Sequence, residues 1–318
     1  MLYSIAVNHN KMGKITFIAT VFNEEASIVQ LLESLKKQTK KADEIIIVDA
    51  GSRDGTVSLI NEFIQNNKKQ NVLLLKKKGN RSVGRNTAIK KARGDIIIAS
   101  DAGCTLKCDW IEKITRPFLD QKVDVVAGFY KPVAKNIFQK SLAAYTSVMP
   151  DKVTSEFLPS SRSIAFRKSA WQKSGGYPEN LSTCEDLVFA RHLKKMGFKF
   201  KVEKRAIVYW PQRENLLQAF FQFFTYAKGD GKAHYIRKQT PLLFLRYILF
   251  FLLCWFVGSI NIGLLIPVVS LSVFLYSVWS ISKNYKYVKS KSAFIYLPIL
   301  QVVSDIAVIF GMTFGFFA

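Results

Sequence analysis

The chain has 318 residues, a hydrophobic fraction of 49% and a formal net charge of +23. The length exceeds one average domain, and a single soluble domain seldom combines such apolar content with so much positive charge. The combination indicates a basic soluble part joined to a membrane part. Lysines are spread along the chain and no nucleic-acid-binding motif is present, so we expect no nucleic acid partner. Residues 1–14 contain no long apolar segment, so we expect no cleaved signal peptide.

The first part of the chain alternates between strand and helix patterns. Apolar, β-branched runs predict strands at residues 15–21, 44–48, 72–75 and 96–99, and apolar residues at helical spacing predict helices at 27–37, 57–64 and 81–91. Further strands are expected at 123–129 and 163–166, a helix at 185–196, and two edge strands at 199–202 and 206–210. This alternation is typical of an α/β fold with a mostly parallel, Rossmann-like sheet.

Polar residues follow three of these strands directly. They are the segment 22–24, Asp49 and Asp101. Because parallel strands end at the same edge of a sheet, we expect these residues to converge on one crevice. Carboxylates there can bind a ribose or a base, or hold a divalent metal on a diphosphate. Arg81 and Arg85 follow the third strand and could meet the diphosphate charge.

The C-terminal part has the composition of a membrane region. A bilayer span needs about 20 apolar residues, and the pattern predicts spans at 242–259, 262–281 and 294–317, after an amphipathic interfacial helix region at 215–240. We therefore divide the chain into an α/β domain at 1–214, the interfacial region, and a transmembrane region at 241–318. Lysines at 283–291 predict a cytoplasmic loop, and hence a multi-pass protein of the cell membrane with its α/β domain in the cytoplasm. Asp305 is costly in lipid and should face another helix.

An ordered series of motifs over residues 15–231 resembles the inverting glycosyltransferases of family 2, which have the GT-A fold, and in particular the membrane-anchored bacterial and archaeal type. The motifs are TVFNEE at 20–25, DAGSRDGT at 49–56, GRN at 84–86, SDAG at 100–103, GGY at 175–177 and ED at 185–186. The resemblance implies a nucleotide-sugar donor linked to UDP, GDP or dTDP.

The resemblance also assigns roles to individual residues. Residues at the ends of the first two strands are expected to line the pocket for the nucleotide base; they are Thr20, Phe22, Glu24 and Asp49. Arg85 is expected to approach the nucleotide, and Asp101 is expected to contact the ribose or the metal. Asp186 is expected to act as general base on the acceptor hydroxyl, which must lose its proton as it attacks, and Glu185 to orient the acceptor. Gly176, Tyr177 and Arg213 are expected on the acceptor or diphosphate side. Residues 160–162 either reach the acceptor or form a surface loop.

The metal site departs from the family pattern. The Asp-x-Asp element usually has a second acid where this chain has Gly103. Three explanations compete. Asp101 alone could hold Mg²⁺ or Mn²⁺ together with the diphosphate, Arg213, Lys228 or Lys232 could neutralise the leaving group instead, or the site could be inactive.

The Glu-Asp pair also bears on the acceptor. A polyprenyl phosphate is already an anion and needs no base, whereas a hydroxyl does. The Gln-x-x-Arg-Trp pattern of processive synthases is absent from this chain. We therefore expect a non-processive glycosyltransferase that acts on a glycan or a lipid-linked glycan at the membrane. The alternatives are a polyprenyl-phosphate sugar synthase and a catalytically inactive nucleotide-sugar-binding membrane protein.

Overall fold

The structure is a computed structural model that describes residues 13–318, so most of the segment for which we expect no signal peptide lies outside the described residues. The chain forms two compact units. The first contains the described residues up to Lys131 together with Thr154–Asn180 and Glu185–Trp210, and the second contains Pro132–Val153, Leu181–Cys184 and Pro211–Ala318. The units are not continuous in sequence. The division into domains at residues 214 and 240 therefore stays a prediction.

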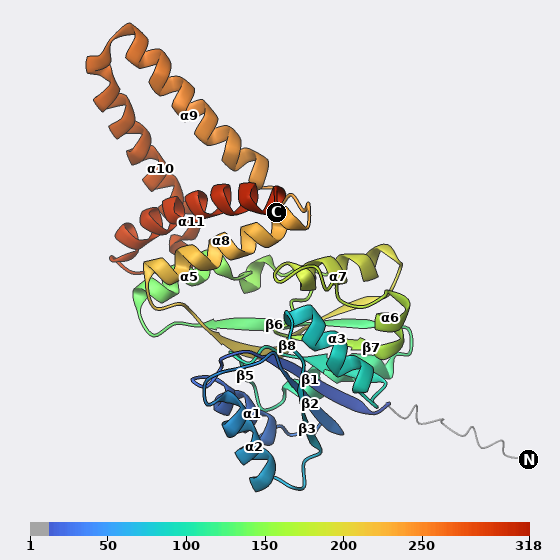
Figure 1. The fold of residues 1–318 in the computed structure, drawn as a ribbon. Helices are drawn as coiled ribbons and strands as arrows, with labels where there is room; N and C mark the ends of the chain where they lie inside the picture. The colour runs from blue at the N-terminus through green and yellow to red at the C-terminus, as the bar shows by residue number, and fades with distance from the viewer. Residues whose placement is uncertain (1–12) are drawn as a thin grey trace, which may run out of the picture. The chain divides into compact units, whose positions relative to one another are not determined.

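The first unit is built on a mixed sheet with the strand order β3-β2-β1-β4-β7-β6-β8-β5 (Figure 1). The strands β1, β2, β3 and β4 pair in parallel, whereas β7 is antiparallel to both β4 and β6. Their bounds are β1 Ile15–Val21, β2 Glu44–Asp49, β3 Val72–Lys76, β4 Ile96–Ala99, β5 Thr105–Leu106, β6 Val125–Val133, β7 Ile164–Arg167 and β8 Phe200–Pro211. The predicted α/β fold with a mostly parallel sheet is confirmed.

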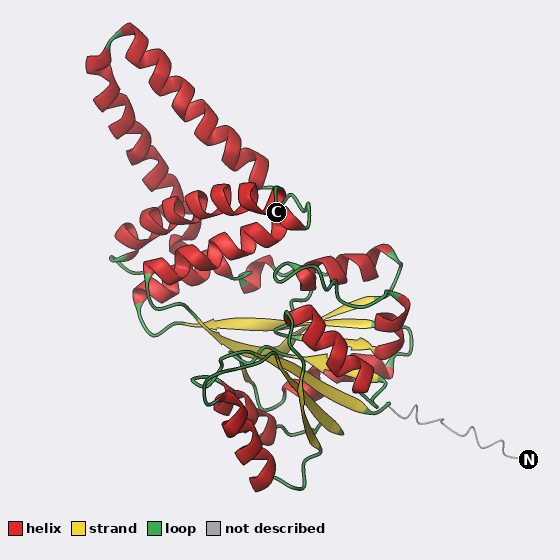
Figure 2. Ribbon diagram, in the orientation of Figure 1, coloured by secondary structure: helices red, strands yellow, loops and turns green. Residues whose placement is uncertain are grey.

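Helices cover both faces of this sheet (Figure 2). On one face Phe17 packs in a cluster with Leu31 and Trp110, and on the other Ile97 packs with Ile89 and Phe189. Burial on both sides explains why the central strands are continuous apolar runs. The helices are α1 Ile28–Lys36, α2 Thr56–Asn66, α3 Arg81–Lys91, α4 Trp110–Thr115, the 3-10 helix Arg116–Leu119, α6 Lys168–Lys173 and α7 Glu185–Lys195.

The prediction of two separate edge strands at 199–202 and 206–210 is wrong, because one continuous strand, β8, spans this region. The charged segment between them led to the error. Glu203 and Arg205 lie two residues apart and so share one face of the strand, where Arg205 Nε donates to Glu203 Oε1 at 2.8 Å. Charged side chains on an exposed strand face do not interrupt the strand.

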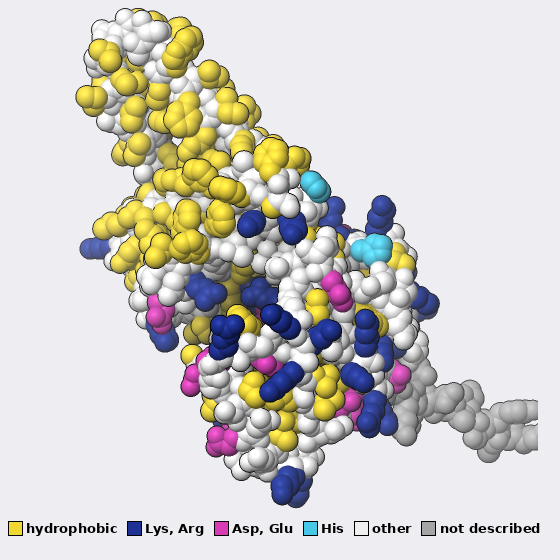
Figure 3. All heavy atoms as spheres, viewed as in Figure 1, with side chains coloured by type: hydrophobic (Ala, Val, Ile, Leu, Met, Phe, Trp, Pro, Cys, Tyr) yellow, Lys and Arg dark blue, Asp and Glu magenta, His cyan; other side chains and the backbone are white. Residues whose placement is uncertain are grey.

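The second unit is helical and contains three helices that are long and apolar enough to cross a membrane, as predicted. Figure 3 shows hydrophobic side chains gathered over them. The helices of this unit are α5 Ile137–Thr146, the 3-10 helix Pro150–Lys152, α8 Leu216–Lys232, α9 Thr240–Ile260, the 3-10 helix Ile262–Leu264, α10 Leu265–Val288 and α11 Ala293–Phe316. Asn261 lies between α9 and α10, and its Oδ1 accepts from Gly263 N at 2.8 Å, which stabilises the turn between the two helices.

Helix α8 packs closely along α11 (Figure 1). A Cβ atom at Gly311 or Gly315 of α11 would lie 2.4 or 2.1 Å from backbone oxygens of Phe224 and Lys228, so small residues permit this approach. Leu217 and Phe221 near the start of α8 are exposed. The interfacial position of α8 stays a prediction.

Asp305 of α11 faces its neighbours, as its cost in lipid predicts. Its carboxylate accepts hydrogen bonds from the hydroxyls of Tyr247 on α9 and Tyr276 on α10, and from Gln301. A carboxylate in an apolar helix is thereby supplied with donors from three helices.

Candidate active site

The polar strand ends lie at one edge of the sheet in the first unit. Strand β1 pairs in parallel with β2 and with β4, so the segment 22–24, Asp49 and Asp101 all follow strands that end at the same edge. Strand β7 runs in the opposite direction beside β4, and therefore begins where β4 ends. The residues before β7 join this edge from a distant part of the sequence.

Asp49 supports the loop after β2. Its buried carboxylate accepts from Gly51 N and Ser52 N, both at 3.1 Å. Gly51 has φ +104°, a left-handed conformation that glycine adopts without strain. Phe22 beside this loop is 57% exposed.

Thr20 and Glu24 lie at the first strand end. A Cβ atom at Gly84 would come within 2.5 Å of Thr20 Cγ2, so glycine at this position lets α3 pack directly on β1. The half-buried Glu24 accepts from the Ser27 hydroxyl at the start of α1. The roles of Thr20, Phe22, Glu24 and Asp49 at a nucleotide base stay predictions.

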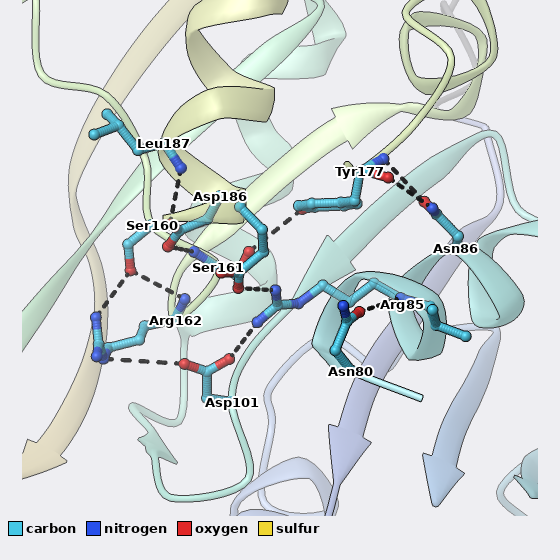
Figure 4. A network of polar contacts seen from close by, with 12 residues as sticks. Asn80, Arg85, Asn86, Asp101, Ser160, Ser161, Arg162, Tyr177, Asp186 and Leu187 are labelled. Atoms are coloured by element: carbon cyan, nitrogen blue, oxygen red, sulfur yellow. Dashed lines mark hydrogen bonds and ion pairs between the residues drawn. The ribbon is translucent and has the colours of Figure 1, made fainter. Parts of the chain in front are cut away.

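Arg85 connects two of the predicted functional carboxylates (Figure 4). Its Nη1 lies 2.5 Å from Glu185 Oε1 and its Nη2 lies 2.9 Å from Asp101 Oδ1. The guanidinium is buried and lies over the ring of Tyr177, 5.4 Å from its centroid. Burial opposes the charge of Arg85, but Glu185 and Asp101 outweigh that penalty and raise the pKa of the guanidinium. Arg85 is therefore a permanent cation at the centre of the site.

Asn86 fixes the Gly-Gly-Tyr turn next to Arg85. Its Oδ1 accepts from Tyr177 N at 2.9 Å and from Trp171 Nε1 at 3.0 Å, and its Nδ2 donates to Tyr177 O at 2.9 Å. A Cβ atom at Gly176 would meet Asn86 Oδ1 at 2.9 Å, and Gly176 has φ +88°. Tyr177 is itself buried and stacks on Phe189. The structure thus places Gly176 and Tyr177 in a rigid support beneath the site, and their contact with an acceptor stays a prediction.

Glu185 and Asp186 point in different directions at the start of α7. Glu185 is buried against Arg85, and burial raises its pKa by more than the Arg85 charge lowers it. Asp186 is half-buried, and its oxygens accept from Ser161 N at 3.1 Å and Leu187 N at 2.8 Å (Figure 4). One carboxylate of the pair is therefore committed to the interior, whereas the other reaches the surface of the site.

Arg162 occupies a position that the sequence did not reveal. The loop before β7 lies between the two acids, because Ser161 contacts Asp186 and Arg162 approaches Asp101, with Nε 4.0 Å from Oδ2 (Figure 4). The guanidinium lies over the ring of Trp210, 4.1 Å from its centroid. Ser161 is buried and Arg162 is half-buried, and a contact of residues 160–162 with the acceptor stays a prediction.

Asp101 is held as an anion by arginines. Burial alone would raise its pKa, but the charges of Arg85, Arg162 and Arg81 outweigh burial and lower it. The side chain remains 34% exposed at the sheet edge. Asp101 is therefore ionised at neutral pH and still accessible to a ligand.

The residues around Asp101 do not form a divalent metal site by themselves. Among residues 13–318, no three His, Cys, Asp or Glu side chains lie close enough together to hold a metal ion. Asp101 Oδ1 accepts from Arg85, and Oδ2 faces Arg162, whereas Mg²⁺ and Mn²⁺ prefer several oxygen ligands. A Cβ atom at Gly103 would meet nothing within 4 Å, so the surrounding structure leaves room for a side chain at this position. Two guanidinium groups beside one carboxylate do not fit a metal centre.

The basic residues that we expected near a leaving group belong to the second unit. Arg213 is exposed after β8, and Lys228 and Lys232 lie on α8. Their role stays a prediction, as does that of Arg213 at the acceptor or diphosphate.

Comparison with known proteins identifies relatives of this chain. The model of the family described as glycosyl transferase family 2 matches residues 16–175. The succinoglycan biosynthesis protein ExoA of Rhizobium meliloti (strain 1021) is 28% identical over 232 residues, which cover 69% of this chain and 69% of that protein. The O-antigen chain rhamnosyltransferase RfbN of Salmonella typhimurium is 26% identical over 222 residues, 63% of this chain and 69% of that protein.

A solved structure shows the same fold over nearly the whole chain. The mannosyltransferase PcManGT from Pyrobaculum calidifontis, in complex with GDP-Man and Mn²⁺, has a TM-score of 0.62 at 17% identity and covers 94% of this chain and 88% of that one. This likeness confirms the GT-A-like fold. The family match spans the strand ends, Arg85, Asp101 and Arg162 described above. The chain belongs to glycosyl transferase family 2.

Proposed function

We propose that this chain is a membrane-anchored, inverting and non-processive glycosyltransferase. It moves a sugar from a nucleoside-diphosphate donor to a hydroxyl of a glycan or lipid-linked glycan at the cytoplasmic face of the cell membrane. The observation that carries this proposal is that the two neighbouring acids have different surroundings. Glu185 is buried against Arg85, whereas Asp186 remains half-buried at the site. A hydroxyl acceptor requires one such accessible carboxylate.

The chemistry follows from that accessible carboxylate. The acceptor oxygen forms a bond to the anomeric carbon, the bond from that carbon to the β-phosphate oxygen breaks, and its electron pair leaves with the nucleoside diphosphate. The proton of the acceptor passes to Asp186, whose oxygens are oriented by Ser161 N and Leu187 N. Asp101 pairs with Arg85 and faces Arg162. With one carboxylate acting as base and no covalent bond between sugar and protein, the reaction is a direct displacement, and a direct displacement inverts the anomeric centre.

Glu185 is better suited to positioning than to acceptor binding. Its carboxylate lies 2.5 Å from Arg85 Nη1 and is buried. Through Arg85 it is linked to Asp101, 2.9 Å from the same guanidinium. We therefore assign Glu185 to holding Arg85, and through Arg85 the position of Asp101.

The membrane setting is supported by the second unit and by the relatives. Three helices are long and apolar enough to cross a bilayer, and Lys286, Lys289 and Lys291 lie at the connection between α10 and α11. Positive connections of this length favour the cytoplasmic side. The names of two relatives refer to succinoglycan and to O-antigen chains, which are polysaccharides, and this supports a glycan as acceptor.

The test is nucleoside diphosphate release by the purified full chain in detergent, with a panel of UDP-, GDP- and dTDP-sugars. One donor class should be hydrolysed slowly. Asp101→Asn should reduce release at least about tenfold, because it weakens a charged hydrogen-bond network. Glu156→Gln changes an exposed carboxylate of the same unit and should leave release unchanged. Release from no donor class, or full activity of Asp101→Asn, would contradict the proposal.

A further inference from the structure

Strand pairing places Arg162 opposite Asp101. Strands β4 and β7 are antiparallel, with Ile96 opposite Arg167 and Ala99 opposite Ile164. Asp101 lies two residues after Ala99, and Arg162 lies two residues before Ile164. The register of the sheet therefore carries Arg162 to the same edge as Asp101, and the two charges meet with Nε 4.0 Å from Oδ2.

Aromatic rings hold the Arg162 guanidinium in place. It lies 4.1 Å from the ring centroid of Trp210 and 5.4 Å from that of Tyr130, and its Nη1 donates to Ser160 Oγ at 3.4 Å. The two rings contact each other edge to face at 6.0 Å. Stacking of this kind orients a planar cation before any ligand arrives. The side chain of Arg162 is nevertheless 18% exposed.

The two arginines beside Asp101 differ in what they contact. Arg85 is buried and is shared between Glu185 and Asp101. Arg162 approaches the second carboxylate oxygen of Asp101, Oδ2. A Cβ atom at Gly103, which replaces the usual second acid, would meet nothing within 4 Å. A diphosphate brought beside Asp101 needs positive charge there, and a guanidinium offers paired donors that match phosphate oxygens.

We propose that Arg162 binds the diphosphate of the donor and stabilises the departing nucleoside diphosphate, in place of a metal ion held by an Asp-x-Asp pair. This inference rests on the proposed function. When the bond between the anomeric carbon and the β-phosphate oxygen breaks, the electron pair moves to that oxygen, and the Arg162 guanidinium donates to it. Trp210 and Tyr130 are positioning residues for the guanidinium. Nucleotide binding by this chain consequently does not depend on a divalent cation.

The experiment measures binding of UDP, GDP and dTDP to the full chain in detergent by calorimetry, first in excess EDTA and then with Mn²⁺. The best-bound nucleotide should keep its affinity in EDTA within about threefold. Arg162→Met should weaken its binding in EDTA about ten- to a hundredfold, which corresponds to the loss of charged hydrogen bonds. The matching nucleoside, which has no phosphate, should bind the variant and the parent equally.

Two further variants keep the test interpretable. Arg167→Met removes the arginine at the other end of β7, which lies over Phe118, and should leave diphosphate binding unchanged. Arg162→Lys keeps the charge but loses the planar fork, so it should bind with intermediate affinity, and thermal unfolding verifies that each variant is folded. Binding that vanishes in EDTA and returns with Mn²⁺, or a folded Arg162→Met that binds like the parent, overturns the inference alone. A parent chain that binds none of the three nucleotides under either condition overturns the proposed function as well.

Discussion

Removing Arg85 should destabilise the first unit strongly, and the size of the effect follows from its contacts. Arg85 is buried, and its two nitrogens lie 2.5 Å from Glu185 and 2.9 Å from Asp101. Arg85→Met leaves a buried carboxylate without its cation, which costs about 3–5 kcal/mol. For a unit of this size each kcal/mol lowers the unfolding temperature by about 2–4 °C, so we expect a fall of roughly 6–20 °C.

The assay is thermal unfolding of the full chain in detergent, followed by tryptophan fluorescence. Trp171 reports on the site directly, because its Nε1 donates to Asn86, the neighbour of Arg85. Arg205→Met is the matched control, since Arg205 pairs with Glu203 at an exposed position and should change little. Adding Glu185→Gln to Arg85→Met should recover part of the loss. If Arg85→Met lowers the unfolding temperature no more than Arg205→Met does, the ion pairs of Arg85 with Glu185 and Asp101 do not stabilise the first unit.

The remaining predictions concern pH, the missing acid and close packing. Arg85 contributes to a folded-state pKa of Asp101 that lies below the usual 3.8. The Arg85–Asp101 ion pair therefore stabilises the folded state fully at pH values above 3.8, and this stabilisation is lost as the pH falls through the folded-state pKa. The difference in unfolding temperature between the parent and Arg85→Met should therefore shrink in acid, and a constant difference from about pH 7 to about pH 3 would refute the linkage. Gly103→Asp has room for its side chain and should make nucleotide binding respond to Mn²⁺ at least about tenfold in calorimetry, because it adds a second carboxylate ligand; an unchanged response would contradict this. Gly84→Ala places a Cβ atom 2.5 Å from Thr20 Cγ2 and should cost about 1–3 kcal/mol in the same unfolding assay, and Thr20→Ser should recover part of it; equal unfolding of Gly84→Ala and the parent would contradict the close approach.

The elements that depend on local pattern could be predicted from the sequence. The strand from Ile96 to Ala99 is apolar on both faces and is followed by Ser100 and Asp101, so both the strand and the polar residues at its end were evident. The three apolar helices followed from length and composition in the same way. In each case the signal lies within about 20 consecutive residues.

The contacts that depend on pairing between distant segments could not be predicted. Arg85 and Glu185 are 100 residues apart, and spacing does not show that the guanidinium would select Glu185 and leave Asp186 accessible. Arg162 faces Asp101 because β7 is antiparallel to β4 in one particular register. A shift of one residue in that register would turn the opposite set of side chains toward the site, and no sequence pattern fixes it.

The central claim is that Asp186 removes the proton from a hydroxyl acceptor. The most direct measurement compares Asp186→Asn with the parent in sugar transfer to a lipid-linked glycan and, in parallel, to polyprenyl phosphate. We predict transfer by the parent to the glycan hydroxyl and a loss of about 10²–10⁴-fold in Asp186→Asn, the usual contribution of a general base. Transfer to polyprenyl phosphate that Asp186→Asn leaves nearly intact would contradict the claim and identify a polyprenyl-phosphate sugar synthase.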